Sequence, residues 1–135
     1  MKDMHGKVKV IHAISPQAVG TTGAAGGVTS GVIDRRGYDS IEFFYTSGTS
    51  ATVADTVTPV IFECDTTGGT FTSVASADLL PDTGEAALTL TTGVSGNIGY
   101  RGNERYLKIR LYGTGTATAL VAAVAVAGDM DRSPQ

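Results

Sequence analysis

The sequence predicts an all-β protein, an antiparallel jelly-roll-like β-sandwich of about eight strands. Charged residues make up 17% of the chain, so its solvated surface must be built largely from Thr, Ser and Gly. The chain also contains 18 Gly without a Gly-X-Y period, which is typical of a protein with many turns. Short segments of alternating apolar and polar residues recur at the spacing expected of a sandwich or barrel, and no segment has a convincing helical period. At 135 residues the chain is expected to form a single domain.

The N-terminal part is expected to contain an arm, one strand and a glycine-rich segment. Residues 1–6 precede the first alternation and are interpreted as a flexible arm. Lysines alternate with valines from Lys7 onward, which predicts a strand with one polar face, and Pro16 is expected to end it. Residues 19–31 are rich in Gly and poor in bulky side chains, so we expect a mobile loop or an arm that is ordered by a partner chain.

Two further strands are expected in the middle of the chain. Residues 41–46 alternate in period two and predict a half-buried strand that ends at a Ser-Gly turn. Residues 56–65 predict another strand, in which Pro59 indicates an edge or a bulge because it has no backbone N–H to donate. Residues 66–69 form a predicted turn, after which residues 70–74 resume a strand.

The C-terminal part carries the clearest strand pattern. Residues 81–84 predict a turn and residues 87–90 a short strand. The next strand places three apolar residues on a core face against three others on the opposite face: Leu107, Ile109 and Leu111 against Lys108, Arg110 and Tyr112. Residues 119–128 are apolar on both faces, which favours a strand covered on both sides, with an Ala-rich helix as the alternative.

Several classes of function lack support in the sequence. Nucleophilic catalysis needs a His base beside a nucleophile, but His5 and His12 both lie in the N-terminal arm and first strand. One Cys and two His match no zinc pattern, so we expect neither a metal nor a cofactor. The net charge of −3 does not favour nucleic acid or an anionic membrane as a partner. Cys64 is the single cysteine, so no disulfide forms within the chain, and no cleavable signal is recognised; we therefore expect a protein that folds in the cytoplasm.

Two basic segments are candidate contact sites. In "DRRGYD", Gly37 allows a positive φ, so we expect a tight turn whose N–H groups bond to Asp34 and Asp39. Arg35 and Arg36 are then expected to point outward toward carboxylates of a neighbouring chain. Arginines and lysine also interleave with tyrosines between residues 100 and 112, a composition that favours a protein interface over single-stranded nucleic acid.

Three segments of the sequence match a known pattern. The pattern has an Ile-Asp-Thr-Arg-Gly-Tyr-Asp-Ser-like segment, an acidic strand before Phe-Thr-Ser-Val, and a Gly-Asn-Arg-Tyr-like segment before the last two strands. The matching positions are Ile33–Ser40, Glu63–Val74 and Tyr100–Arg110, with Arg35 where the pattern has a Thr-like residue. In these segments the chain resembles small head decoration, or cement, proteins of tailed bacteriophages and prophages.

The resemblance implies a jelly-roll-like domain that assembles on the outer capsid surface of a virion. It implies a structural protein without enzymatic activity, made in the host cytoplasm, which binds the major capsid protein and bridges neighbouring subunits. We also expect a homo-oligomer, a trimer rather than a dimer. The alternatives are a phage tail or head-fibre β module that contacts host surface glycan, and a small β-sandwich hydrolase. The candidate capsid or oligomer contacts are Arg35, Arg36, Tyr38, Arg101, Arg105, Tyr106, Lys108, Arg110 and Tyr112.

Overall fold

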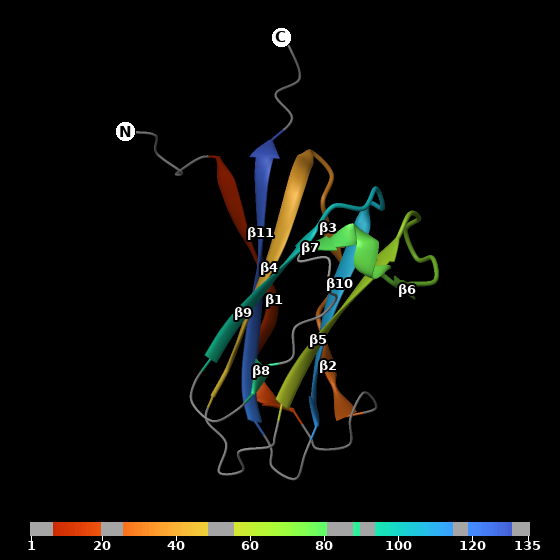
Figure 1. Cartoon of the computed structure of the whole chain (residues 1–135). Coiled ribbons are helices and arrows are strands. Elements are labelled where there is room, and N and C mark those ends of the chain that lie inside the picture. The colour runs from red at the N-terminus through yellow and green to blue at the C-terminus, as the bar shows by residue number, and fades with distance from the viewer. Residues whose placement is uncertain are drawn as a thin grey trace.

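The computed structural model of the chain is a sandwich of two antiparallel sheets (Figure 1). The structure describes residues 7–19, 26–48, 56–80, 88–89, 94–114 and 119–130. Sheet A has the order β1 (Val8–Val19), β11 (Ala119–Met130), β4 (Tyr38–Ser47), β9 (Val94–Tyr100) and β7 (Leu79–Leu80). Sheet B is built around β10 (Tyr106–Thr114) and β5 (Thr56–Cys64), together with β2 (Val28–Thr29), β3 (Ile33–Asp34), β6 (Thr72–Ser73) and β8 (Leu88–Thr89).

The connections between the strands give the sandwich a jelly-roll topology. The first strand pairs with the last, since β1 lies beside β11, and β11 lies beside β4. The chain passes from β1 in sheet A to β2 and β3 in sheet B, returns to β4 in sheet A and crosses again to β5 in sheet B. Strands from the two halves of the chain therefore interleave within each sheet, as in jelly rolls. The predicted fold class is confirmed, and a short 3-10 turn, η2 (Ser76–Asp78), precedes β7.

The core lies between the two sheets and follows the alternation of the sequence. In β4 the side chains of Ile41, Phe43 and Tyr45 are buried, and the residues between them are half-buried or exposed. In β10 the predicted core face, residues 107, 109 and 111, is fully buried, so this pattern is also confirmed. Because side chains alternate across a strand, each of these strands presents its other face away from the core.

The last strand is confirmed as a strand, but the expectation that it is covered on both sides is wrong. The alanines and valine at residues 119, 121, 123, 125 and 127 face the core and are buried. On the opposite face Leu120 is 64% exposed and Val124 is 36% exposed. The sequence could not reveal this difference because both faces are apolar. The outer face of β11 therefore meets no cover within the described part of this chain.

The first strand does not end at Pro16. β1 continues to Val19, and its pairing with β11 is irregular between Ile14 and Gln17. β1 is an edge strand of sheet A, where a missing N–H on the free side costs no ladder hydrogen bond. Pro59 behaves as predicted: β5 pairs with β8 at residues 56–57 and with β6 at residues 62–63, so Pro59 lies between these partners at an open edge.

Part of the glycine-rich segment is ordered by this chain itself. Gly27 packs so closely against β10 that a Cβ at this position would lie 2.9 Å from Leu111 O. Val28 and Thr29 pair with β10 as β2, and the Ser30 N–H donates to Ile109 O at 2.8 Å. For residues 26–31 the expectation of a mobile loop or an arm held by a partner is therefore wrong. Residues 20–25, the arm at residues 1–6 and the turn predicted at residues 81–84 lie outside the described residues.

Two smaller expectations are met by the described structure. The turn at residues 66–69 is present, with Gly68 at a φ of 76° and the Gly69 N–H donating to Thr66 O at 3.0 Å. The short strand expected at residues 87–90 is observed as β8. No helix in the described part of the chain is long and apolar enough to cross a membrane.

Candidate functional site

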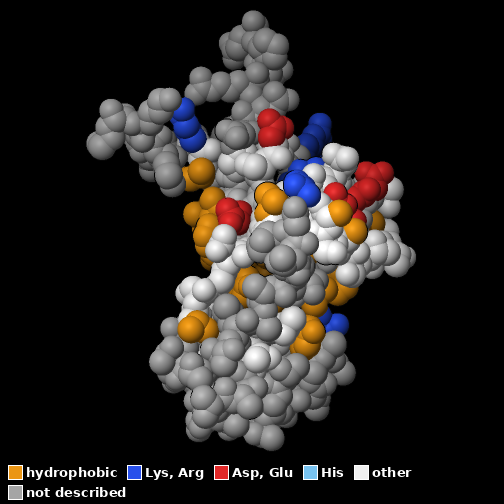
Figure 2. Space-filling model, in the orientation of Figure 1, with side chains coloured by type: hydrophobic (Ala, Val, Ile, Leu, Met, Phe, Trp, Pro, Cys, Tyr) orange, Lys and Arg blue, Asp and Glu red, His pale blue; other side chains and the backbone are white. Residues whose placement is uncertain are grey.

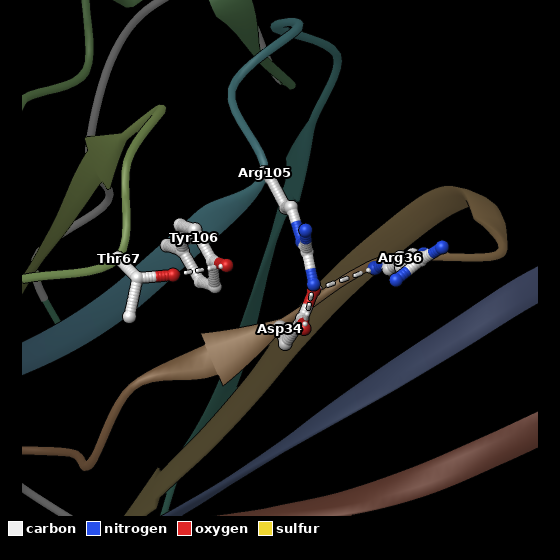
Figure 3. A network of polar contacts seen from close by, with 5 residues as sticks. All are labelled: Asp34, Arg36, Thr67, Arg105 and Tyr106. Atoms are coloured by element: carbon white, nitrogen blue, oxygen red, sulfur yellow. Dashed lines mark hydrogen bonds and ion pairs between the residues drawn. The ribbon is translucent and has the colours of Figure 1, made fainter.

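The first and last matched segments meet at one end of the sandwich, where they form a basic corner of residues 33–38 and 102–105 (Figure 3). The Arg105 guanidinium forms a bidentate pair with Asp34, with Nε 2.9 Å from Oδ1 and Nη2 2.7 Å from Oδ2. The Arg36 N–H donates to Asp34 Oδ1 at 3.0 Å, and Gly37 has a φ of 86°. The predicted turn and the role of Asp34 in it are confirmed.

The charge of Arg105 in the basic corner is balanced by Asp34 of the same chain. The guanidinium of Arg105, together with the Arg36 N–H, lowers the pKa of Asp34 to about 2 despite some desolvation. The hydrogen bonds between Arg105 and Asp34 in turn raise the pKa of Arg105. The Arg105 guanidinium also lies 4.8 Å from the ring centroid of Tyr106. Arg105 therefore already has a carboxylate partner and an aromatic neighbour in the isolated chain.

Arg35 does not point outward toward a neighbour, so this expectation is wrong. Its Nε donates to Glu104 O at 2.6 Å and its Nη2 donates to Gly102 O at 2.8 Å. Its guanidinium lies 5.2 Å from the ring centroid of Tyr100. These bonds hold the loop that precedes β10 against the turn that precedes β4. Arg36 does point away from the Asp34–Arg105 pair, as expected (Figure 3).

Tyr100 joins the two sheets beneath the basic corner. Its hydroxyl donates to Glu63 Oε2 of β5 at 2.5 Å and accepts the N–H of Glu104 at 3.0 Å. Burial raises the pKa of Tyr100, and the hydrogen bond to Glu63 raises it further. Gly102 packs directly on the Tyr100 hydroxyl and ring, where an added Cβ would collide. Tyr100 and Glu63 both lie in the matched segments, but nothing in the sequence predicts that their side chains form a hydrogen bond.

A cleft of about 400 Å³ opens beside the basic corner. Its walls are Val32, the turn at residues 66–69, Phe71, Tyr106 and Lys108. The Thr67 hydroxyl lies 2.6 Å from the Tyr106 hydroxyl (Figure 3). The Lys108 ammonium lies 4.0 Å from the ring centroid of Phe71, in the range of a cation–π contact. We call this feature the cleft. It was not predicted, because its walls come from three distant parts of the sequence.

The outer face of sheet A carries several exposed apolar side chains beside polar ones such as Thr46 and the hydrogen-bonded pair of Glu42 and Asn97. Val124 of β11 lies opposite Phe44 of β4 in the ladder, and both are partly exposed, at 36% and 42%. Val10 of β1 and Leu120 of β11 are each 64% exposed. A shallow depression of about 230 Å³ lies between β9, β4 and β11 on this sheet. Figure 2 shows hydrophobic side chains along the left margin of the molecule, where Figure 1 places β1 and β11.

The remaining candidate contacts differ in how accessible they are. Arg101 donates its Nε to Ala77 O at 2.8 Å and is exposed. Tyr38 is half-buried and lies 6.0 Å from the Lys9 ammonium, measured to the ring centroid. Arg110 and Tyr112 are half-buried on β10 beside Gly27. The structure brings the arginines at 35, 36 and 105 together in the basic corner and places Tyr106 and Lys108 in the cleft.

Residues that could hold a metal ion do not gather in the described part of the chain. No group of three or more His, Cys, Asp or Glu residues there could hold a metal ion. His12 is exposed on β1 and bonds to the Ser15 hydroxyl at 3.0 Å. Cys64 is buried, and its thiol donates to Thr66 O at 3.3 Å. His5 lies outside the described residues.

The chain is a jelly-roll β-sandwich. Exposed apolar side chains lie on the outer face of sheet A, and the basic corner, where Arg105 is paired with Asp34, lies at one end. No family model matches the chain. No curated protein matches it either.

Solved structures with the same fold include one of PBSX exported protein XepA, with a TM-score of 0.58 and 13% identity over 100% of this chain and 41% of that one. A structure of infectious bursal disease virus, Gx strain, has a TM-score of 0.55 and 15% identity over 95% of this chain and 33% of that one. The N-terminal xylanase 10B of Clostridium thermocellum, with CBM22-1 and GH10 modules and xylohexaose, has a TM-score of 0.58 and 9% identity over 95% of this chain and 26% of that one. The chain thus spans less than half of each of these proteins, and the likeness concerns the fold.

Proposed function

We propose that this protein is a phage capsid decoration protein that binds the outer surface of the major capsid protein shell and bridges neighbouring subunits. The observation that carries the proposal is the set of exposed apolar side chains on the outer face of sheet A, Val10, Phe44, Leu120 and Val124, which supports a protein that works in contact with other protein chains, copies of itself included. Exposed apolar side chains that gather on one face of a protein are typical of contact with other protein chains. The resemblance to head decoration proteins supplies the partner, and the fold shared with a virus structure and with a PBSX protein is compatible with it.

The proposed mechanism is mechanical and needs no catalysis. A single interface of standard size buries roughly 800 Å² on each partner. Many copies on a closed shell make contacts that must break together before the shell can open, so modest individual affinities combine into a strong reinforcement.

We also propose that copies of the chain associate through the outer face of sheet A, as a trimer rather than a dimer. Phe44 and Val124 would then leave water, which stabilises the assembly by roughly 25 cal/mol for each Å² of apolar surface buried. The basic corner and the cleft lie at the end of the sandwich, so they remain available to a different partner when this face is covered.

The test is co-sedimentation of the purified protein with undecorated, expanded capsids of the major capsid protein from the same genome. We expect saturable binding and a capsid that resists heat or chelation better when it is decorated. Capsids that sediment without the protein at micromolar concentrations would contradict the proposal.

A second candidate function is a head-fibre or tail β module that contacts host surface glycan. The observation in its favour is the fold shared with a xylanase structure that contains xylohexaose. A glycan array distinguishes the two functions: binding to defined glycans without binding to capsids would favour the fibre module.

A further inference from the structure

The cleft contains a cation that no carboxylate of the described residues pairs with. Arg105 is paired with Asp34 and Arg35 is bonded to backbone carbonyls, so neither is free to recognise a partner. Lys108 instead lies over the ring of Phe71, and no carboxylate of the described residues pairs with its ammonium. A cation on an aromatic face keeps its hydrogen-bond donors, because the ring offers no lone pairs in return.

The walls of the cleft indicate which chemical group would carry a negative charge to Lys108. Val32 is 55% exposed at one side, and Phe71 and the backbone of Gly68 and Gly69 form much of the rest. The hydroxyls of Thr67 and Tyr106 bond to each other, and no carboxylate lines the cleft. A sugar would bury several hydroxyls against these walls, and each hydroxyl without a partner is costly. A carboxylate on an aliphatic stem matches the walls better.

We propose that the cleft binds an acidic side chain of a partner polypeptide, with its carboxylate at Lys108 and its aliphatic part against Val32 and Phe71. The identification of that polypeptide with the capsid shell rests on the proposed function, whereas the preference of the cleft for an acidic peptide does not. A charge pair that is shielded from water by such walls sets specificity, because a neutral side chain would leave the ammonium without its partner.

The first experiment tests the chemistry of the cleft without capsids. The peptide acetyl-Leu-Glu-Leu-amide is titrated into the isotope-labelled protein to about 10 mM and followed by NMR, with acetyl-Leu-Gln-Leu-amide as the matched control. We expect shifts centred on residues 32, 68, 69, 71 and 108 for the acidic peptide, and roughly tenfold weaker binding of the neutral peptide. Lys108→Gln should remove the difference between the peptides. Lys9→Gln, which removes an equal charge near Tyr38, should keep it.

Three results would overturn the proposal. They are the absence of shifts in the cleft at 10 mM, equal binding of the two peptides by the wild-type protein, and shifts with glucuronate but not with the acidic peptide. Thermal melts of both variants check that they remain folded: Lys9 is exposed, and the half-buried Lys108 keeps its aliphatic stem as Gln, so we expect small changes in stability for both.

The second experiment separates the cleft from the proposed function. Wild type, Lys108→Gln and Lys9→Gln are co-sedimented with undecorated capsids at low and high salt. A loss of affinity of about tenfold for Lys108→Gln alone supports the cleft as the docking site. Equal binding of the three proteins overturns the cleft as the docking site and leaves the proposed function intact. Failure of the wild type to bind overturns the proposed function, and the peptide titration alone then decides the chemistry of the cleft.

Discussion

The pair between Asp34 and Arg105 is expected to stabilise the fold by joining two segments that are far apart in the sequence. Asp34→Asn removes the charge but keeps an oxygen that can accept the N–H of Arg36, so the turn itself should persist. The guanidinium of Arg105 lowers the pKa of Asp34 from 3.8 to about 2, a shift that corresponds to roughly 2 kcal/mol without screening. The two side chains are 39% and 43% exposed, and solvent screening reduces this figure. We expect Asp34→Asn to cost about 0.5–1 kcal/mol at pH 7.

The pH dependence of this loss follows from the sign of the shift. The folded state holds the pKa of Asp34 below its unfolded value, so the pair stabilises the fold fully at pH values above about 4. Its contribution disappears as the pH falls toward 2 and the carboxylate becomes protonated. The difference between wild type and Asp34→Asn should therefore be constant from pH 7 to about 5 and close below that range.

Urea unfolding at one protein concentration, followed by far-UV circular dichroism, measures this difference. Arg105→Gln and the double variant complete a cycle that isolates the pair. We expect a coupling energy that falls at high salt because the pair is exposed. A loss of the same size at pH 3 as at pH 7, or a coupling energy of zero, would refute the reasoning.

Two further predictions concern the core and the outer face of sheet A. Gly102→Ala should lower the free energy of unfolding by about 1–3 kcal/mol, because the added Cβ would collide with the buried Tyr100 ring. Gly31→Ala, with no atom near its Cβ, should be almost neutral in the same urea titration. Equal effects of the two changes would contradict this prediction. Val124→Lys should dissociate the oligomer in light scattering because it places a charge on the apolar face, while Thr29→Lys on exposed β2 should not. A wild-type protein that is monomeric at tens of micromolar would remove the basis for this prediction.

The sequence predicted β4 and β10, because their period-two pattern is a direct record of burial, but it did not predict β9. Ile109 and Phe43 belong to β10 and β4, and both are fully buried. The pattern carried less information where both faces are apolar. Nothing in the sequence distinguishes Ala123, which is buried, from Leu120, which is exposed. The assignment of the inner face depends on which sheet lies opposite, and that is a property of the whole fold.

The errors at Pro16 and in the glycine-rich segment have a common physical origin. Both predictions used local preferences alone, that is, the missing N–H of proline and the small bulk of glycine. In the fold, Pro16 lies on an edge strand where the N–H is not needed. β10 approaches residue 27 so closely that only glycine fits there. At this position the small residue therefore reflects packing against a neighbouring strand and is no sign of mobility.

The candidate contacts could be recognised by residue type but not divided by role. Arg35 and Lys108 were both candidate contacts in the sequence, as basic residues within three positions of a tyrosine. In the structure Arg35 bonds to two backbone carbonyls of the loop before β10, whereas Lys108 faces a cleft. Such a division depends on contacts between residues more than sixty positions apart, which single-sequence patterns do not contain.

The three segments that match the sequence pattern, residues 33–40, 63–74 and 100–110, converge on the same end of the sandwich. The first segment meets the third through Asp34 and Arg105, and the second meets the third through Glu63 and Tyr100. These segments therefore form one three-dimensional unit, in which the bonded groups form a scaffold and the cleft is the open part. If the scaffold only supports the cleft, the loss of free energy of proposed capsid binding in Asp34→Asn should be no larger than its loss of free energy of unfolding. Lys108→Gln should then weaken binding while stability stays constant, and this separation of the two effects distinguishes a docking surface from the structure that holds it.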